Sequence, residues 1–246
     1  MTFTYDGYIE LINLLKENRY QIGNYHDWEE YDRCVILRHD VDNDLQKALE
    51  MAELEYRNGI RSTYFVLLTS NFYNLYSHKS RKILSKVQDM GHTIGIHFDE
   101  MAYPADSGNA NRIELDIQRE LDILSEILGK KVIDFSYHRP TKEILDADIS
   151  ITGAVNAYGT QFFREFKYLS DSRMHWRESV DTIIQSAVFP RLQILTHPFW
   201  YHKEELDIRG VLWNFINNAR IDRYQNIDEN MRDLSKIIKS EELYKV

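Results

Sequence analysis

The sequence predicts an α/β fold in which parallel strands, each followed by a helix, close into a barrel or part of one. Short apolar runs alternate along the chain with segments whose apolar residues recur every three or four positions, the pattern of strands alternating with helices. The strands read as continuous apolar runs, as expected for a parallel sheet covered on both faces. A chain of 246 residues is long enough for one such domain.

Glycines mark the ends of most predicted helices, because glycine readily ends a helix. The first helix carries apolar residues from Tyr5 to Leu15 and is followed by a short polar stretch. The next three run over about residues 45–56, 83–90 and 113–128, and they end at Gly59, Gly91 and Gly129. A long helical region begins at about Leu206.

About seven strands are predicted. The clear ones cover residues 34–38, 62–68, 93–96 and 132–137, and the less clear ones cover 154–157, 168–169 and 192–196. No repeat, low-complexity tract or linker interrupts the chain. We therefore expect a single domain over residues 1–246, with an N-terminal helical extension (1–30) and a C-terminal helical region (204–246).

Composition restricts the class of protein. A net charge of −9 disfavours non-specific binding to nucleic acid or to an anionic membrane, because both are polyanions. A single cysteine, Cys34, excludes an intrachain disulfide. The first residues lack the pattern of a signal peptide, and no apolar run approaches the roughly 20 residues of a bilayer span, so we expect a cytoplasmic protein. The tyrosine content weakly favours a carbohydrate ligand.

Polar side chains follow the predicted strands at their carboxyl ends, where active sites of such folds lie. Asp40 and Asp42 end the first strand, and alternation places both on one face together with Arg38. Two adjacent carboxylates repel each other unless a cation or a shared proton relieves them. The alternative interpretation is a simple turn in which Asp42 or a following residue caps the next helix.

Histidines end three further strands: His97, His138 and His197. Taken singly, each could be an ordinary hydrogen-bonded residue, and the pair His138-Arg139 could lie in a surface turn. Taken with the paired aspartates, they suggest a mononuclear metal site with a separate acid and base. The aromatic residues after His197 could form a rim for a sugar ring or belong to the core.

Six segments in chain order strengthen this interpretation. They are Arg38-His-Asp-Val-Asp42, Tyr64-Phe-Val-Leu, Gly91-His-Thr-Ile-Gly-Ile-His97, His138-Arg139-Pro140, Tyr168-Leu-Ser-Asp171 with Trp176, and Leu195-Thr-His197. This order resembles the polysaccharide deacetylase superfamily, the carbohydrate esterases that include chitin and peptidoglycan deacetylases. The similarity spans about Val35 to Tyr201, with the first motif in an Asp-x-Asp form. It implies a distorted, TIM-like (β/α) barrel.

The resemblance also implies a role for each matching residue. Asp40 would be the general base, and Arg139 would pair with it and hold it ionised. Asp42 and His97 would ligate one divalent metal ion, zinc. His197 would protonate the leaving group, and Asp171 would orient His197. The catalytic set is therefore Asp40, Arg139, Asp171 and His197.

One position departs from the family pattern. A second metal histidine is expected four residues after His97, and Met101 stands there. A thioether is a poor zinc ligand, so the third ligand must come from elsewhere. His138 is the first candidate, provided that the chain turns there, and Glu100 and Asp99 are the next.

The expected activity is metal-dependent hydrolysis of an N-acetyl or O-acetyl group on a sugar or related small molecule, with Trp176, Trp200 and Tyr201 contacting the substrate. Two alternatives remain open. The chain could be a non-catalytic member of the fold that binds carbohydrate or a protein partner, or it could hydrolyse a non-sugar amide. The C-terminal helical region could close the barrel or form a homodimer contact.

Overall fold

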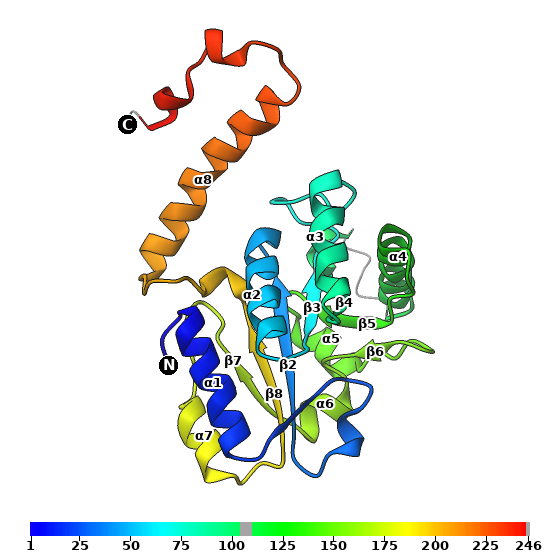
Figure 1. Ribbon diagram of the computed structural model, residues 1–246. Coiled ribbons are helices and arrows are strands. Elements are labelled where there is room, and N and C mark those ends of the chain that lie inside the picture. Colours follow the sequence, from blue (N-terminus) through cyan, green and yellow to red (C-terminus); the bar gives the residue numbers. More distant parts are fainter. Residues whose placement is uncertain (104–109, 245–246) are drawn as a thin grey trace. The chain divides into compact units, whose positions relative to one another are not determined.

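The computed structural model describes residues 1–103 and 110–244 (Figure 1). Its contacts divide the chain into two compact units, Met1–Lys203 and Glu204–Val246. The boundary falls where the C-terminal helical region was expected to begin. The second unit contains the helix α8 (Ile208–Asp228) and two short 3-10 helices, η5 (Leu234–Lys236) and η6 (Ser240–Tyr244). Within the described residues, no helix combines the length and apolar composition needed to cross a bilayer.

The first unit is built on one parallel sheet, as predicted. Its strands are β1 (Gln21–Gly23), β2 (Cys34–Val41), β3 (Thr63–Val66), β4 (Thr93–Phe98), β5 (Asp134–Tyr137), β6 (Val155–Asn156), β7 (Lys167–Ser170) and β8 (Arg191–Thr196). The strand order is β6-β5-β4-β3-β2-β8-β7, and β1 pairs with β2 beside this path. These seven ordered strands curl into part of a barrel, so the distorted (β/α) barrel is confirmed.

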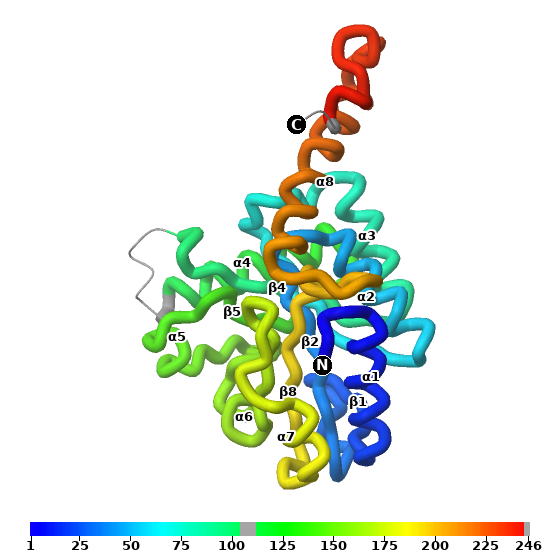
Figure 2. The backbone as a smooth tube through the Cα atoms, turned by 90° about the vertical axis from the view of Figure 1, so that its left-hand side faces the viewer, coloured from blue at the N-terminus to red at the C-terminus, as the bar shows by residue number. Residues whose placement is uncertain are grey.

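Helices connect the strands. They are α1 (Tyr5–Glu17), α2 (Leu45–Arg57), α3 (His78–Asp89), α4 (Ala110–Leu128), α5 (Lys142–Ala147), α6 (Thr160–Arg164) and α7 (Val180–Ser186), with the 3-10 helices η1 (Trp28–Glu30), η2 (Glu100–Ala102) and η4 (Pro198–Trp200). Figure 2 shows α1 and α2 on one side of β2 and β8, and α5 and α6 on the other. The central strands are therefore covered on both faces, which explains their continuous apolar sequence.

The start of α2 decides one of the alternatives left open by the sequence. Asp44 is its N-cap, and its Oδ1 accepts hydrogen bonds from the backbone N–H groups of Gln46 and Lys47. The helix ends before Gly59, whose φ of +70° is a conformation that favours glycine. Because Asp44 caps the helix, Asp42 remains available for the site.

Strand β2 shows how the sequence positions the site. Its odd positions, including Val35 and Leu37, pack in an apolar cluster with α1. Its first even positions, Cys34 and Ile36, pack on the other face with aromatic residues. That inner cluster comprises Tyr25, Trp28, Phe65, Phe162 and Phe166 together with Ala157. The aromatic cluster fills the inside of the curled sheet at one end. The next even-numbered residues of β2, Arg38 and Asp40, lie on the same inner face toward the other end of the sheet.

Strand β1 was not predicted, because residues 1–30 were expected to form only a helical extension. The strand has three residues, too few for an alternating pattern. It pairs with Cys34–Ile36 of β2, whereas β3 pairs with residues 38–41 of the same strand. The N-terminal segment therefore extends the sheet as well as contributing α1.

Candidate metal centre and active site

The inner face of β2 carries an ion pair directly above the aromatic cluster. Arg38 is fully buried, and its Nη2 donates to Oδ1 and Oδ2 of Asp40 at 2.9 and 2.8 Å. The guanidinium lies over the rings of Phe65 and Tyr158, 5.0 and 4.7 Å from their centroids. A planar guanidinium suits both contacts, so Arg38 fixes the orientation of the Asp40 carboxylate.

This ion pair corrects the expectation for Arg139. Its side chain is 76% exposed, and its nearest carboxylate is Asp99, at 4.0 Å. The partner of Asp40 is Arg38. The reason lies in the backbone, because β5 ends at Tyr137 and Arg139 adopts a left-handed conformation with φ +52°. The turn carries Arg139 to the pocket rim while His138 stays inside.

Three side chains converge at the carboxyl ends of β2, β4 and β5. Asp42 Oδ1 lies 3.3 Å from His97 Nε2 and 3.3 Å from His138 Nδ1, and these two nitrogens are 3.2 Å apart. Among the described residues, these three form the group of His, Cys, Asp and Glu side chains that could hold a metal ion. His138 thus stands where the third ligand was sought.

The spacing of these atoms fits a metal ion. Zinc binds nitrogen and oxygen ligands at about 2.0–2.2 Å, which places neighbouring ligand atoms of a tetrahedron roughly 3.3–3.5 Å apart. The three observed separations are at or just below that range. Asp42 Oδ1 is buried without a hydrogen-bond partner among the described residues, although it faces both imidazoles. A cation at the centre of the triangle would satisfy all three atoms and leave a fourth position open.

Other residues orient the two imidazoles. His97 Nδ1 lies 2.7 Å from Ser136 Oγ, so the hydroxyl accepts the Nδ1 proton when Nε2 faces the centre. The backbone N–H of His138 donates to the carbonyl of Phe98 at 2.7 Å, which ties the end of β5 to β4. Burial acts to raise the pKa of Asp42, but His138 and His97 outweigh it and hold that pKa well below its usual range.

A fourth strand end brings His197 to the same place. Its Nδ1 lies 2.6 Å from Oδ1 of Asp171, and its backbone N–H also donates to that carboxylate. Its Nε2 faces Asp42 Oδ2 at 3.9 Å. Burial alone would lower the pKa of His197, but Asp171, with Asp42 and Asp40, raises it to about 9. At neutral pH the ring therefore carries a proton that it can donate at Nε2.

A buried polar network supports these strands from behind. His39, on the outer face of β2, lies 2.7 Å from Thr196 Oγ1 and 3.0 Å from Glu55 Oε1. Glu55 also accepts hydrogen bonds from the hydroxyls of Tyr8 and Tyr64. Burial acts to raise the pKa of Glu55, but His39 and its hydrogen-bond donors lower it to about 2. This network joins β2 to β8 next to His197, and sequence reasoning missed it.

The site opens into a pocket of about 690 Å³. Asp40, Asp42, His97, His138 and His197 lie along its wall. Six aromatic side chains also line it, namely Phe72, Tyr137, Tyr158, Phe163, Tyr168 and Trp200. Pockets of this size and mixed lining are typical of small-ligand sites.

Two of the three residues expected to contact the substrate lie elsewhere. Tyr201 is only 2% exposed and packs against Phe3 and Tyr8 in the core. Trp176 packs against the same core cluster and lines a separate, smaller pocket. Trp200 does line the main pocket, with its ring centroid 6.4 Å from that of His197. Aromatic residues near a strand end serve core and pocket alike, so sequence alone could not separate them.

The remaining ligand candidates, Asp99 and Glu100, are hydrogen-bonded elsewhere. Met101 is 74% exposed on η2. Glu100 accepts a hydrogen bond from the backbone N–H of Thr141, and Asp99 caps η2 through the N–H of Met101. Of the candidates for a third ligand, His138 is the one that lies together with Asp42 and His97.

No protein-family model and no curated protein matches this chain. Solved structures resemble this chain at low sequence identity. A family 4 carbohydrate esterase from Bacillus anthracis is 15% identical, with a TM-score of 0.45 over 84% of this chain and 83% of that one. The deacetylase PplD from Streptococcus pyogenes, in complex with acetate, is 11% identical, with a TM-score of 0.43 over 86% of each chain.

A CE4 family pseudoenzyme from Bacillus anthracis also matches, at 12% identity and a TM-score of 0.45, over 78% of this chain and 62% of that one. The three structures belong to the carbohydrate esterase and polysaccharide deacetylase group that the sequence motifs resemble. What the site of this chain does is judged from its own residues.

Proposed function

We propose that this chain is a metal-dependent hydrolase that removes an acetyl group from a sugar or a related small molecule. The observation that carries the proposal is the convergence of Asp42 Oδ1, His97 Nε2 and His138 Nδ1 at metal-ligand spacing. Beside them stand two ionisable groups, each with its own orienting partner: Asp40 with Arg38 and His197 with Asp171. A site that only binds a ligand does not require a metal-ligand set with two oriented ionisable groups beside it.

Asp42, His97 and His138 would hold the ion, and the two-imidazole, one-carboxylate donor set suits zinc. When bound, a divalent ion lowers the pKa of a water molecule and polarises an acyl carbonyl. Asp40 accepts the proton of the attacking water, because its Oδ2 lies 3.5 Å from His97 Nε2, at the edge of the ligand set. Arg38 holds the carboxylate in place during this transfer.

His197 supplies the second proton transfer. Its Nε2 faces the ligand set from the β8 side, while Asp171 binds Nδ1 and fixes the ring. Burial lowers the pKa of the ring, but Asp171, the strongest of the influences that raise it, favours the protonated form. The ring therefore donates a proton to the departing amine or alcohol as the acyl bond breaks, and Asp171 stabilises the ring charge before that step.

The test is acetate release from a panel of N-acetylated and O-acetylated sugars, followed before and after removal of metal with a chelator. We expect release by the zinc-loaded protein, loss with the chelator, recovery on adding zinc, and no release by Asp42→Ala. Asp122→Ala, on an exposed face of α4, is the matched control and should behave as wild type.

Two outcomes would contradict the proposal. A protein that binds zinc but releases acetate from no sugar, while hydrolysing simple N-acyl amides, would be the amide hydrolase considered above. A protein that hydrolyses neither class would be a non-catalytic binding protein. The location in the cytoplasm, expected from the sequence, remains a prediction that cell fractionation would test.

A further inference from the structure

Three arginines line the pocket outside the candidate metal centre: Arg139, Arg173 and Arg177. We propose that they bind an anionic group of the substrate, so that the enzyme acts on acetylated sugars that carry a phosphate or a carboxylate. This inference rests on the proposed function for its reaction, but the binding of the anion can be measured separately.

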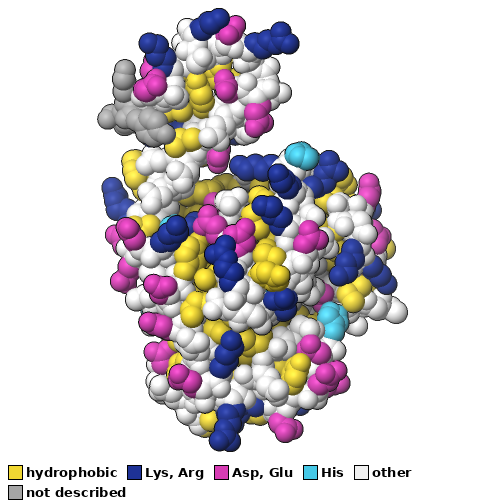
Figure 3. Space-filling view, in the orientation of Figure 1, with side chains coloured by type: hydrophobic (Ala, Val, Ile, Leu, Met, Phe, Trp, Pro, Cys, Tyr) yellow, Lys and Arg dark blue, Asp and Glu magenta, His cyan; other side chains and the backbone are white. Residues whose placement is uncertain are grey.

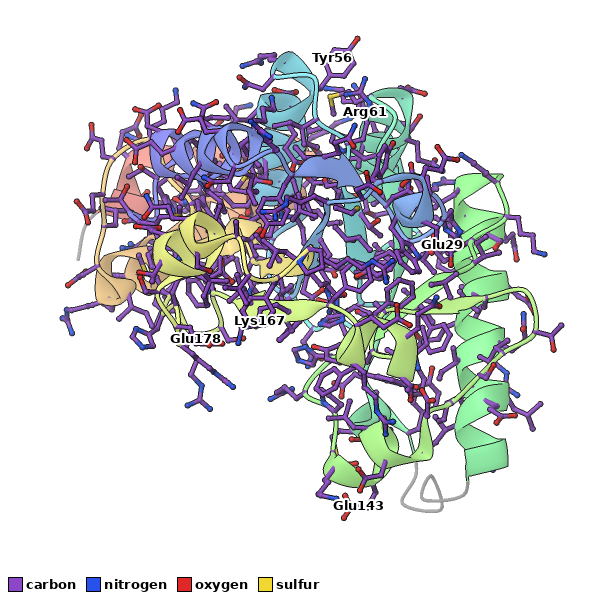
Figure 4. The ribbon with its side chains drawn as sticks, turned by 90° about the horizontal axis from the view of Figure 1, so that it is seen from below. Glu29, Tyr56, Arg61, Glu143, Lys167 and Glu178 are labelled. Carbon is purple, nitrogen blue, oxygen red and sulfur yellow. The ribbon has the colours of Figure 1, made fainter. Side chains whose placement is uncertain are left out.

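Arg173 and Arg177 belong to the connection between β7 and α7, which is anchored on both sides. Asp171, at its start, is fully buried against His197. Glu178, near its end, accepts hydrogen bonds from Lys167 of β7 at 2.7 Å to both carboxylate oxygens, and Figure 4 shows the two side chains together. The connection is thus fastened to the strand that carries the site, and it presents both arginines to the pocket.

The charges of these arginines are not neutralised locally. Among residues 1–103 and 110–244, neither Arg173 nor Arg177 has an ion-pair partner, and Arg139 reaches only Asp99, at 4.0 Å. Glu178, the neighbour of Arg177, is already bound by Lys167. Arg173 and Arg177 therefore keep their full capacity to bind an oxyanion, for which planar guanidinium donors are well suited, and Arg139 shares its charge with Asp99.

The acidic residues of the pocket do not cancel this charge. Asp40 is paired with Arg38, and Asp42 belongs to the ligand set with His97. Asp99 also lines the pocket and lies 4.0 Å from Arg139, so it offsets the charge of that arginine alone. The chain as a whole has a net charge of −9, and Figure 3 shows acidic and basic side chains interspersed over the face that it displays. The cluster of arginines at the pocket is therefore a local positive charge on an acidic protein. A cleft concentrates the electrostatic field of such charges on an incoming anion.

The same pocket offers apolar faces for the sugar ring. Phe72, Phe163 and Trp200 line it together with the arginines. Aromatic faces bind the apolar side of a pyranose, and guanidinium groups bind a charged substituent. The combination selects a sugar with an anionic group over a neutral one, while the acetyl group lies at the ligand set.

The experiment compares zinc-loaded wild type on N-acetylglucosamine, N-acetylglucosamine 1-phosphate and N-acetylmuramic acid, with acetate release as the readout. We expect kcat/KM to be about tenfold or more higher for an anionic sugar than for the neutral one, because hydrogen bonds to charged groups are among the stronger ones. The preference should weaken with added salt. Whichever anionic sugar is preferred identifies phosphate or carboxylate as the group bound.

Arg173→Gln and Arg177→Gln should each lower the ratio of anionic to neutral kcat/KM about tenfold. Arg81→Gln, an exposed arginine of α3 outside the pocket, is the matched control and should leave the ratio unchanged. Equal kcat/KM for neutral and anionic sugars in the wild type, or a ratio that both pocket variants leave unchanged, would overturn the inference.

A binding measurement separates this inference from the proposed function. Calorimetry on Asp40→Asn should detect tighter binding of N-acetylglucosamine 1-phosphate or N-acetylmuramic acid than of the neutral sugar, with the preference lost in the arginine variants. If no substrate releases acetate but this pattern is seen, the reaction is wrong and the anion site stands. If acetate is released and binding shows no preference, the anion site is wrong and the reaction stands.

Discussion

Asp42 Oδ1 and His138 Nδ1 are 3.3 Å apart, although two strands, β3 and β4, separate their own strands in the sheet. Neighbouring strands lie about 4.8 Å apart, so three steps across a flat sheet would cover roughly 14 Å. The curl of the sheet, together with the inward reach of both side chains, closes this distance. The candidate metal centre is therefore a product of the incomplete barrel, and a flat sheet with the same residues could not form it.

Replacing His138 tests whether it is the third ligand. Because two protein ligands hold zinc far more weakly than three, His138→Ala should lower zinc affinity by at least about 100-fold, more than loss of an outer-shell partner does. A calorimetric zinc titration of the metal-free protein measures this. His175→Ala removes an exposed histidine and is the control. Unchanged affinity in His138→Ala would exclude it as a ligand and make Glu100→Gln the next variant.

Asp40→Asn tests the assignment of the general base. The amide keeps the shape of the side chain and still accepts a hydrogen bond from Arg38, but it cannot take a proton. We expect zinc content to stay the same and kcat to fall by about 100-fold or more. Zinc analysis and acetate release, with an unfolding curve to verify the fold, measure the two effects. A variant with normal kcat would remove Asp40 from the mechanism.

The pair of His197 and Asp171 makes a prediction about protonation. In the metal-free protein, NMR titration of His197 should give a pKa of about 9. The sign follows from the partners, because a carboxylate stabilises the protonated ring and burial opposes it. Asp171→Asn removes the carboxylate charge, so the pKa of His197 should fall and the ring should lose its proton at a lower pH. An unchanged titration in this variant would show that Asp171 is not what raises the pKa.

Glu55 makes a prediction about acid stability. Its folded pKa of about 2 lies below the ordinary value of 4.5, so its stabilising contribution is present above pH 4.5 and is lost as the pH falls toward 2. A difference of this size corresponds to about 3 kcal/mol of unfolding free energy. Glu55→Gln should be less stable at neutral pH and should lose less stability between pH 5 and pH 3, as measured by urea unfolding.

The control for Glu55 is Glu143→Gln, an exposed glutamate in the first turn of α5 (Figure 4). It should show the same pH dependence as the wild type. If Glu55→Gln and the wild type gave parallel curves of unfolding free energy against pH, the network around Glu55 would not contribute to acid sensitivity.

Much of the fold could be predicted because the central strands β2, β3, β4 and β8 are largely buried apolar runs, and because α2, α3 and α4 end near a glycine. The strand ends were predictable for the same reason, and with them the positions of Asp40, Asp42, His97 and His197. The short strand β1 could not be, because its pairing with Cys34–Ile36 depends on tertiary contacts and not on its own pattern.

The pairing of side chains was less predictable than their position. Arg38 stands two residues before Asp40 on the same face of β2, so the sequence did indicate that the two could pair. The resemblance to a family motif nevertheless favoured Arg139 as the ion-pair partner of Asp40. The left-handed conformation of Arg139 turns its side chain away from Asp40, and the pattern of a single sequence does not specify such a turn. That same turn leaves His138 facing Asp42, so the proposed third ligand lies at the end of β5, while Met101 stands where the family histidine was expected.

The most direct test of the central claim is the zinc content of the protein after removal of metal and dialysis against micromolar zinc. Mass spectrometry under native conditions should find one zinc ion per chain in the wild type and none in Asp42→Ala, with both proteins folded. The same zinc content in the two proteins, or none in either, would contradict a metal centre formed by Asp42, His97 and His138.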